Sequence, residues 1–253
     1  MSTQRTAVIT GVGALRGIGR GTAHRFARDQ WVVVGLDLDG VAAERLAVEL
    51  ADRYGVPALG RRVDVADEDS VAAARADVAA AGLPVVGAVL NIAGITSPVP
   101  FLDTTLDLWN RVFAVNATGT YLVTKAFLPE MIDAGIGRVV NMSSVSAQQG
   151  GGVYGKTPYS AAKAAVIGFT HSLARELGPI GITVNAIAPG AVDTDIRLPG
   201  TTPELEAAIV ASVPLGRQAS VDDVAALIAF LASEEAGYLT GTTQNLNGGS
   251  YIG

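Results

Sequence analysis

Cysteine is absent from the 253 residues, which excludes disulfides, thiolate metal sites and a cysteine nucleophile. Charged residues are also scarce, at 17% against 49% hydrophobic residues, and this composition is not that of a disordered chain. The length allows one large domain or two small ones. A domain of about 250 residues buries roughly three quarters of its unfolded surface, so it needs no cross-link for stability.

Excess positive charge is missing as well. The chain carries 24 acidic and 18 basic residues, a net charge of −6, whereas nucleic-acid binding depends on many lysine and arginine contacts to phosphate. Only three of the basic residues are lysines, Lys125, Lys156 and Lys163. We therefore expect no nucleic-acid partner, and any lysine with a chemical role must be one of these three.

Long apolar runs do not occur. None approaches the roughly 20 residues that a membrane span requires, and residues 1–6 lack the apolar core of a secretory signal. We expect a cytoplasmic protein with no membrane partner. The two histidines, His24 and His171, have no H-x-x-x-H spacing and no acidic cluster beside them, so we expect no metal site.

Short apolar runs alternate with longer segments of helical pattern. We expect strands at 6–10, 31–36, 60–63, 85–90, 138–142, 183–187 and 244–246. We expect helices at 17–28, 41–54, 67–80, 106–133, 158–177, 202–212 and 221–231, the last opened by a capping box of Ser220 and Asp223. Continuous Val/Ile strands indicate burial on both faces of a sheet. Alternating strands and helices predict a parallel sheet, in a doubly wound fold or a (β/α)8 barrel.

The first strand runs directly into Gly11-Val12-Gly13-Ala14-Leu15-Arg16-Gly17-Ile18-Gly19. A glycine-rich turn at a helix start offers free N–H groups and a positive dipole end to a phosphate. The strict G-x-G-x-x-G spacing fails, because Arg16 occupies its sixth position. This loop alone therefore fits either a nucleotide site or a tight turn that permits close packing. Its place after the first strand favours the doubly wound sheet (Rossmann fold): a three-layer α/β/α arrangement and a single domain over residues 1–253.

Two Y-x-x-x-K pairs occur, Tyr159 with Lys163 and Tyr121 with Lys125. On a helix this spacing puts phenol and ammonium on one face. A nearby cation lowers the pKa of a phenol from about 10, which makes a tyrosine useful as a general base near neutral pH. Tyr159 follows Ser144 by 15 residues across a glycine-rich loop, whereas Tyr121 has no serine upstream at a strand end. We therefore favour Tyr159.

Over essentially the whole chain, the sequence resembles the short-chain dehydrogenase/reductase family. The glycine loop is similar to the family's T-G-x3-G-x-G, with two extra residues between Gly11 and Gly17. Asn91-Ile92-Ala93-Gly94 resembles N-N-A-G, and Asn247-Gly248-Gly249 resembles D-G-G. Asp64-Val65 looks like the pair that meets the adenine ring. Pro189-Gly190 with Val192 and Thr194 looks like the segment against the nicotinamide.

The resemblance implies a catalytic set, in which Tyr159 is the acid/base, Lys163 its electrostatic partner, Ser144 the oxyanion donor and Asn116 the holder of a water. For Asn116, an ordinary hydrogen-bonded helix residue is the alternative. The implied cofactor-binding residues are Gly11, Arg16, Gly17, Ile18, Gly19, Asp37, Asp64, Val65, Asn91, Ala93, Gly94, Tyr159, Lys163, Pro189, Gly190, Val192 and Thr194. The family also implies a homo-oligomer, most often a tetramer, that pairs the helices 106–133 and 158–177.

The expected function is NAD-dependent hydride transfer between the cofactor and a secondary alcohol or ketone, such as a small alcohol, polyol, sugar or hydroxy acid. An NADPH-dependent ketoreductase of the 3-oxoacyl-carrier-protein reductase type is the alternative. A nucleotide-binding protein without activity is a third possibility, which the complete catalytic set opposes. Enoyl reductases of the superfamily place six residues between tyrosine and lysine, unlike Tyr159 and Lys163. Substrate choice is expected to lie in 148–154 and in a substrate loop at about 195–217, where Arg197 suits either an anionic substrate or solvent.

Asp37 and Arg16 favour different cofactors. A carboxylate at the end of the second strand, where Asp37 stands, binds ribose hydroxyls and repels a 2′-phosphate. Arg16 stands where NADP-using relatives often carry a basic residue, and its guanidinium would suit a phosphate. We expect Asp37 to prevail and the cofactor to be NAD, with Arg16 turned elsewhere or paired with Asp37.

Overall fold

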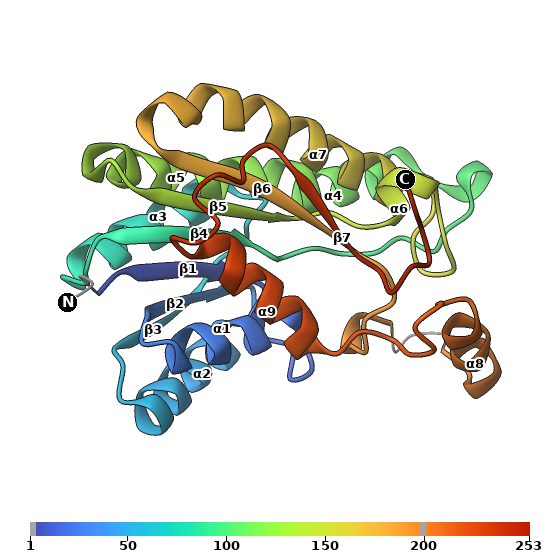
Figure 1. Ribbon diagram of the computed structural model, residues 1–253, viewed down its shortest axis with the longest axis horizontal. Helices are drawn as coiled ribbons and strands as arrows, with labels where there is room; N and C mark the ends of the chain where they lie inside the picture. The colour runs from blue at the N-terminus through green and yellow to red at the C-terminus, as the bar shows by residue number, and fades with distance from the viewer. Residues whose placement is uncertain (1–3, 198–200) are drawn as a thin grey trace.

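The structure, a computed structural model, describes residues 4–197 and 201–253. Its centre is a seven-stranded, all-parallel sheet of order β3-β2-β1-β4-β5-β6-β7 (Figure 1). The strands are β1 (Thr6–Thr10), β2 (Val32–Asp37), β3 (Ala58–Arg62), β4 (Val86–Asn91), β5 (Gly137–Met142), β6 (Ile182–Pro189) and β7 (Thr243–Leu246). The doubly wound α/β domain predicted from the sequence is confirmed.

Helices cover both faces of the sheet. They are α1 (Ile18–Arg28), α2 (Gly40–Tyr54), α3 (Glu68–Ala80), α4 (Leu106–Phe113), α5 (Gly119–Ala134), α6 (Ser146–Gln149), α7 (Thr157–Leu177), α8 (Pro203–Ala211) and α9 (Val221–Ala232). In Figure 1, α1, α2 and α9 lie below the sheet and α5 and α7 above it, while α8 lies beyond its right-hand end.

Each face of the sheet has its own apolar core. Phe26, Leu46 and Ile228 belong to the core under α1, α2 and α9, whereas Phe127 and Leu177 belong to the core beneath α5 and α7. The central strands supply side chains to both, so β1, β4 and β6 are buried along their whole length. This explains why they read as continuous apolar runs rather than as alternating ones.

The helix expected over 106–133 is divided. Between α4 and α5 lies one turn of π-helix, Ala114–Thr118. The side-chain amide of Asn116 donates to the carbonyl oxygen of Val112 at 2.9 Å, the acceptor that an α-helix would give to the N–H of residue 116. Such π-turns are frequent at functional sites. The helix α6 was not expected, while the capping box of Ser220 and Asp223 at α9 is confirmed.

The strand order places a crevice at the carboxyl edge of the sheet. From β1 the chain builds outward to β2 and β3, and then returns to place β4 on the other side of β1. In doubly wound sheets the helices on either side of such a reversal leave the ends of the strands open, and ligands bind there.

Candidate active site

The four predicted catalytic residues line one cavity of about 510 Å³ at this crevice. Ser144 follows β5, Tyr159 lies in the first turn of α7, and Lys163 lies one turn further on. Asn116 comes from the π-turn between α4 and α5. Three separate stretches of chain thus bring an alcohol, a phenol, an amine and an amide to one place.

Lys163 is only 3% exposed, and its Nζ donates to the carbonyl oxygen of Met142 at 2.7 Å. Burial lowers the pKa of Lys163 to about 7, because the charged ammonium loses its hydration. Nζ lies 5.8 Å from the centroid of the Tyr159 ring. The amine is therefore held beside the phenol, with a pKa close to neutral pH.

The pKa of Tyr159 is raised, whereas the sequence predicted that Lys163 would lower it. Enclosure by the protein raises the pKa of the phenol, and a hydrogen bond with Ser144 opposes that rise. Lys163 does not offset the rise, because its Nζ is turned to a backbone carbonyl. In the chain by itself the phenol is therefore held in its protonated form, the form that gives a proton to a carbonyl oxygen.

Asn116 is held by two hydrogen bonds, from Nδ2 to the carbonyl oxygens of Ile95 at 3.0 Å and Val112 at 2.9 Å. Its Oδ1 is buried and has no hydrogen-bond partner among the residues that the structure describes. A Cβ at Gly94 would lie 2.6 Å from this oxygen and 3.3 Å from Lys163 Nζ. Gly94 thus keeps a space open where an acceptor oxygen and an amine face each other.

The second Y-x-x-x-K pair lies elsewhere. Tyr121 is 44% exposed on α5, and Lys125 Nζ is 5.5 Å from its ring centroid. Lys125 also pairs with Glu68 at 3.4 Å. Neither residue of this pair lines the cavity, so Tyr121 and Lys125 form a surface contact between α5 and α3.

The glycine loop leaves the start of α1 open. Gly17 precedes the first helical residue, no side chain caps the helix, and its first turn holds no acidic residue. A Cβ on Gly19 would overlap the carbonyl oxygen of Gly11, which itself has a φ of +75°. The backbone therefore passes too close to α1 for side chains, and the free N–H groups there fit a phosphate.

The other predicted cofactor residues fall into two groups. Ile18, Gly94, Pro189, Gly190, Val192 and Thr194 line the same cavity as Tyr159 and Lys163. Gly11, Asp37, Asp64, Val65, Asn91 and Ala93 lie outside that cavity, at or just after the carboxyl ends of β1 to β4. Asn91 is used by the core, since its Nδ2 donates to Thr124 and Asn141, both at 2.8 Å.

Asp37 faces the glycine loop. Its Oδ2 accepts from the N–H of Gly13 at 2.7 Å, and its Oδ1 accepts from the N–H of Asp39 at 2.9 Å. Of the two alternatives expected for Arg16, the pairing with Asp37 does not occur, and Arg16 is turned elsewhere. It binds Asp195 in the segment after β6, with Nε 2.8 Å from Oδ1.

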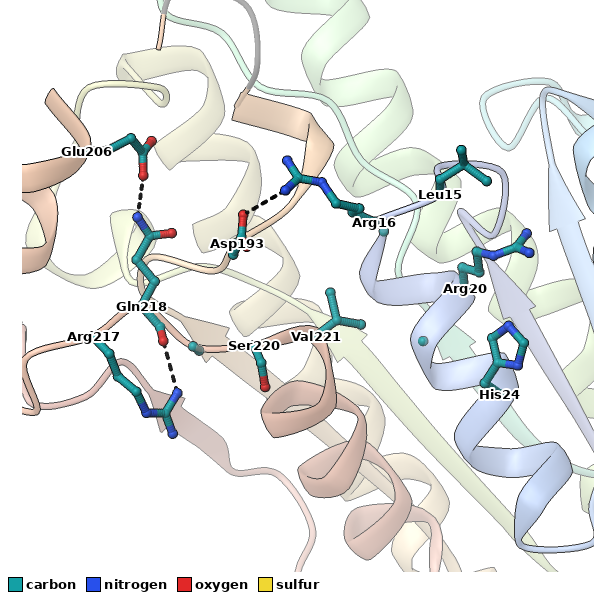
Figure 2. Close-up of a pocket in the computed structure, with 13 residues that line it drawn as sticks. Leu15, Arg16, Arg20, His24, Asp193, Glu206, Arg217, Gln218, Ser220 and Val221 are labelled. Carbon is teal, nitrogen blue, oxygen red and sulfur yellow. Dashed lines mark hydrogen bonds and ion pairs between the residues drawn. The ribbon is translucent and has the colours of Figure 1, made fainter. Parts of the chain in front are cut away.

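A larger crevice of about 810 Å³ lies beside the glycine loop, between α1 and the segments at 193, 206 and 217–221 (Figure 2). Its cations are paired within the protein: Arg20 with Glu49, and Arg217 with Asp223 at 2.7 Å. None of the four predicted catalytic residues reaches it. We therefore place the chemistry in the smaller cavity.

Part of the cavity wall was missed by the sequence analysis. Thr96, Val145 and Ser250 line it without belonging to any motif. The expected specificity segments do contribute, through Gln149, Val153, Tyr154, Ile196, Ile209, Ser212 and Val213. Within the substrate loop, α8 is an ordered helix; residues 198–200 and the side chain of Arg197 lie outside the described part of the chain.

Comparisons with known proteins find relatives along nearly the whole chain. The family model described as "Enoyl-(Acyl carrier protein) reductase" matches residues 11–250. An uncharacterized short-chain type dehydrogenase/reductase of Sinorhizobium fredii is 42% identical over 98% of both chains. A 3-oxoacyl-[acyl-carrier-protein] reductase of Pseudomonas aeruginosa is 40% identical over the full length of both, and an acetoacetyl-CoA reductase of Cupriavidus necator is 37% identical over 99% of this chain and 100% of its own.

A solved structure of one relative has a similar fold. The crystal structure of a 3-oxoacyl-[acyl-carrier protein] reductase from Brucella melitensis aligns with a TM-score of 0.88 at 37% identity, covering 98% of this chain and 92% of the other. Fold and site together define an oxidoreductase that binds a nicotinamide cofactor. The chain belongs to the short-chain dehydrogenase/reductase family. It is an NAD(P)-dependent enzyme of the class that acts on CH–OH groups.

Among the described residues, no helix is both long and apolar enough to cross a membrane.

Proposed function

We propose that the enzyme interconverts a 3-oxoacyl and a 3-hydroxyacyl thioester by hydride transfer with NAD(H). The observation that carries the reaction type is the meeting of Tyr159, Ser144 and Lys163 in one cavity. The substrate class is supported by the names of relatives that are 37–40% identical over their full length. The 3-oxoacyl substrate is the alternative that the sequence left open, whereas NAD is the cofactor that was expected first.

The cofactor, when bound, supplies the hydride to the carbonyl carbon or takes it from the carbinol carbon. In the reduction, the Tyr159 phenol gives its proton to the carbonyl oxygen, and the C=O π-electrons move onto that oxygen as the C–H bond forms. Ser144 donates a hydrogen bond to the same oxygen and so stabilises its developing charge. In the oxidation the proton returns to Tyr159.

Lys163 and Asn116 support the proton transfer. A phenolate is left on Tyr159 after it has given its proton, and Lys163, with Nζ 5.8 Å from the ring centroid, lies beside it on the same helix face to return a proton. Since the pKa of Lys163 is about 7, the amine can pass on a proton near neutral pH. The buried Oδ1 of Asn116, which has no partner among the described residues, faces Nζ across the space kept by Gly94 and could hold the water that the family resemblance implies.

The NAD preference is supported by Asp37. Two backbone N–H groups hold its carboxylate at the carboxyl end of β2, where it would meet the adenosine ribose. A 2′-phosphate there would face a like charge, which costs several kcal/mol. At about 1.4 kcal/mol for each factor of ten, this amounts to a preference of at least about a hundredfold.

Apolar side chains in the cavity wall support an acyl substrate. Val153, Ile196, Ile209 and Val213 line the same cavity as Tyr159 and Lys163. A second candidate is the oxidation of a small secondary alcohol, polyol, sugar or hydroxy acid. Asp37 favours it, because this carboxylate suits NAD, the cofactor of the dehydrogenase that was expected first.

One assay compares the two candidates. Acetoacetyl-CoA reduction with NADH and with NADPH, followed by cofactor absorbance, is run beside a panel of small secondary alcohols with NAD. We expect turnover of the thioester with NADH. Turnover of a small alcohol with an inert thioester would favour the second candidate, and turnover of neither would contradict both substrate assignments.

A further inference from the structure

The side chain of Arg16 crosses from the glycine loop to the segment that follows β6. Its Nε lies 2.8 Å from Oδ1 of Asp195, and its backbone N–H donates to Oδ2 of the same carboxylate at 3.0 Å. Its Nη1 lies 3.4 Å from Asp193 Oδ1, the contact drawn in Figure 2. One residue of the glycine loop thus makes three contacts to two carboxylates about 180 positions further along the chain.

These contacts join the two halves of the site. Asp195 opens the short helix Asp195–Arg197, and its neighbours Thr194 and Ile196 both line the cavity. On the other side, Arg16 directly precedes Gly17, the residue that opens α1. A movement of Asp195 relative to Arg16 would therefore change the cavity wall and the start of α1 together.

The positive charge of Arg16 is already balanced by carboxylates of the protein. Two carboxylates surround one guanidinium, and the hydrogen bonds from Arg16 hold the pKa of Asp195 below its usual range. This local group carries a net negative charge at neutral pH. A phosphate would have to displace a carboxylate that is already in place, and it would meet the charge of the other one.

We propose that Arg16 is a positioning residue that fastens the beginning of the substrate segment to the glycine loop, and that it does not bind a cofactor 2′-phosphate. In this enzyme the basic residue before Gly17 therefore attaches the substrate segment to the glycine loop, and the preference between NAD and NADP is set by Asp37.

The first test needs neither cofactor nor substrate. Amide hydrogen exchange of peptides covering 191–197 and 201–213 is measured for the wild type, Arg16→Gln, Asp195→Asn and the double variant. We expect exchange about two- to fivefold faster in the single variants, the range for one partly exposed ion pair. The double variant should be no faster than Arg16→Gln, because that substitution already removes the ion pair between Arg16 and Asp195.

Arg25→Gln is the matched control, since it removes an arginine–carboxylate pair within α1 and its turn, to Asp29 at 2.6 Å. It should leave the exchange of both peptides unchanged. Equal exchange in the wild type and Arg16→Gln would overturn the attachment, and additive effects in the double variant would show that the two residues act separately.

The second test separates attachment from phosphate binding. NADH and NADPH affinities are measured by fluorescence titration, and kcat and KM with both cofactors. Attachment predicts that Arg16→Gln and Asp195→Asn weaken both cofactors by the same factor and raise substrate KM about two- to fivefold, with little change in kcat. A loss confined to NADPH in Arg16→Gln, and absent from Asp195→Asn, would make Arg16 a phosphate ligand and contradict the proposal. The exchange and titration results stand even if the proposed thioester is not turned over.

Discussion

At the scale of single residues, the two tyrosine–lysine pairs show why a motif needs its surroundings. Both have the same spacing, yet Tyr159 and Lys163 line a cavity with Ser144, while Tyr121 and Lys125 lie on the surface of α5. The discriminating signal in the sequence was the serine 15 residues before Tyr159, because it follows a strand whose end meets the cavity.

Tyr159→Phe should lower kcat/KM by about 100-fold or more, the usual contribution of a positioned acid or base, while NADH affinity changes little. Tyr121→Phe should stay within about twofold, as a surface substitution does. Steady-state kinetics with a cofactor titration measure both. Full activity in Tyr159→Phe, or its loss in a folded Tyr121→Phe, would show that the wrong pair was chosen.

Asp37→Ala should raise kcat/KM with NADPH and lower it with NADH, so that the preference falls by at least about tenfold, or 1.4 kcal/mol. The reason is the removal of a carboxylate that both accepts ribose hydrogen bonds and repels a phosphate. Kinetics with both cofactors test this. A wild type that prefers NADPH would refute the assignment, as would an unchanged preference in Asp37→Ala.

The buried Lys163 should make the free energy of unfolding depend on pH. Its pKa is about 7 in the folded chain and 10.5 ordinarily, so between these values the unfolded chain binds more protons and stability rises with pH. Compared with Lys163→Met, the free energy of unfolding of the wild type should rise from pH 7 to 9 by up to about 1.4 kcal/mol per pH unit.

The measurement is urea unfolding at fixed protein concentration without cofactor. Lys125→Met is the control, because the pKa of Lys125 is raised by Tyr121 and Glu68, and the lysine stays charged throughout this range. Parallel pH profiles for the wild type and Lys163→Met would mean that Lys163 is not desolvated in the folded chain.

At the scale of elements, the order of strands and helices could be predicted from the sequence, because each buried strand is a short apolar run. The split of 106–133 could not, since a side-chain amide at Asn116 competes for a backbone carbonyl without changing the apolar pattern. The contact of Arg16 with Asp195 was missed for another reason. It joins residues 179 positions apart, and no local pattern marks such a pair.

The packing of α1 gives the prediction at this scale. A Cβ at Gly19 would overlap backbone atoms of Gly11, whereas a Cβ at Gly21 would meet side-chain atoms of Val221 and no backbone atom. Gly19→Ala should therefore cost about 1–3 kcal/mol of unfolding free energy and most of the NADH affinity. Gly21→Ala should cost less and keep NADH binding. Denaturant unfolding and titration decide, and equal losses would contradict the close approach at Gly19.

At the scale of the whole molecule, both layers of helices expose large apolar side chains. The layer formed by α4, α5 and α7 lies together on one side of the sheet in Figure 1, and α4 and α5 expose Leu106 at 72%, Tyr121 at 44% and Ile132 at 41%. In the other layer, α2 exposes Val48 and α9 exposes Phe230. Exposed apolar side chains suit a protein–protein contact, and the resemblance to the family places that contact on the helices within 106–133 and 158–177.

We therefore expect a homo-oligomer, a tetramer as in other members of the family. Light scattering at micromolar concentration should give about four times the 25.8 kDa mass of the chain. Tyr121→Lys should shift the distribution toward smaller species, because it puts a charge into an apolar contact, whereas a charge at the solvated Arg28, as in Arg28→Glu, should not. Since association favours the folded state, Tyr121→Lys should also lower Tm and make it more dependent on protein concentration. A monomeric wild type at that concentration would refute the expectation, and an unchanged tetramer in Tyr121→Lys would place the contact on another surface.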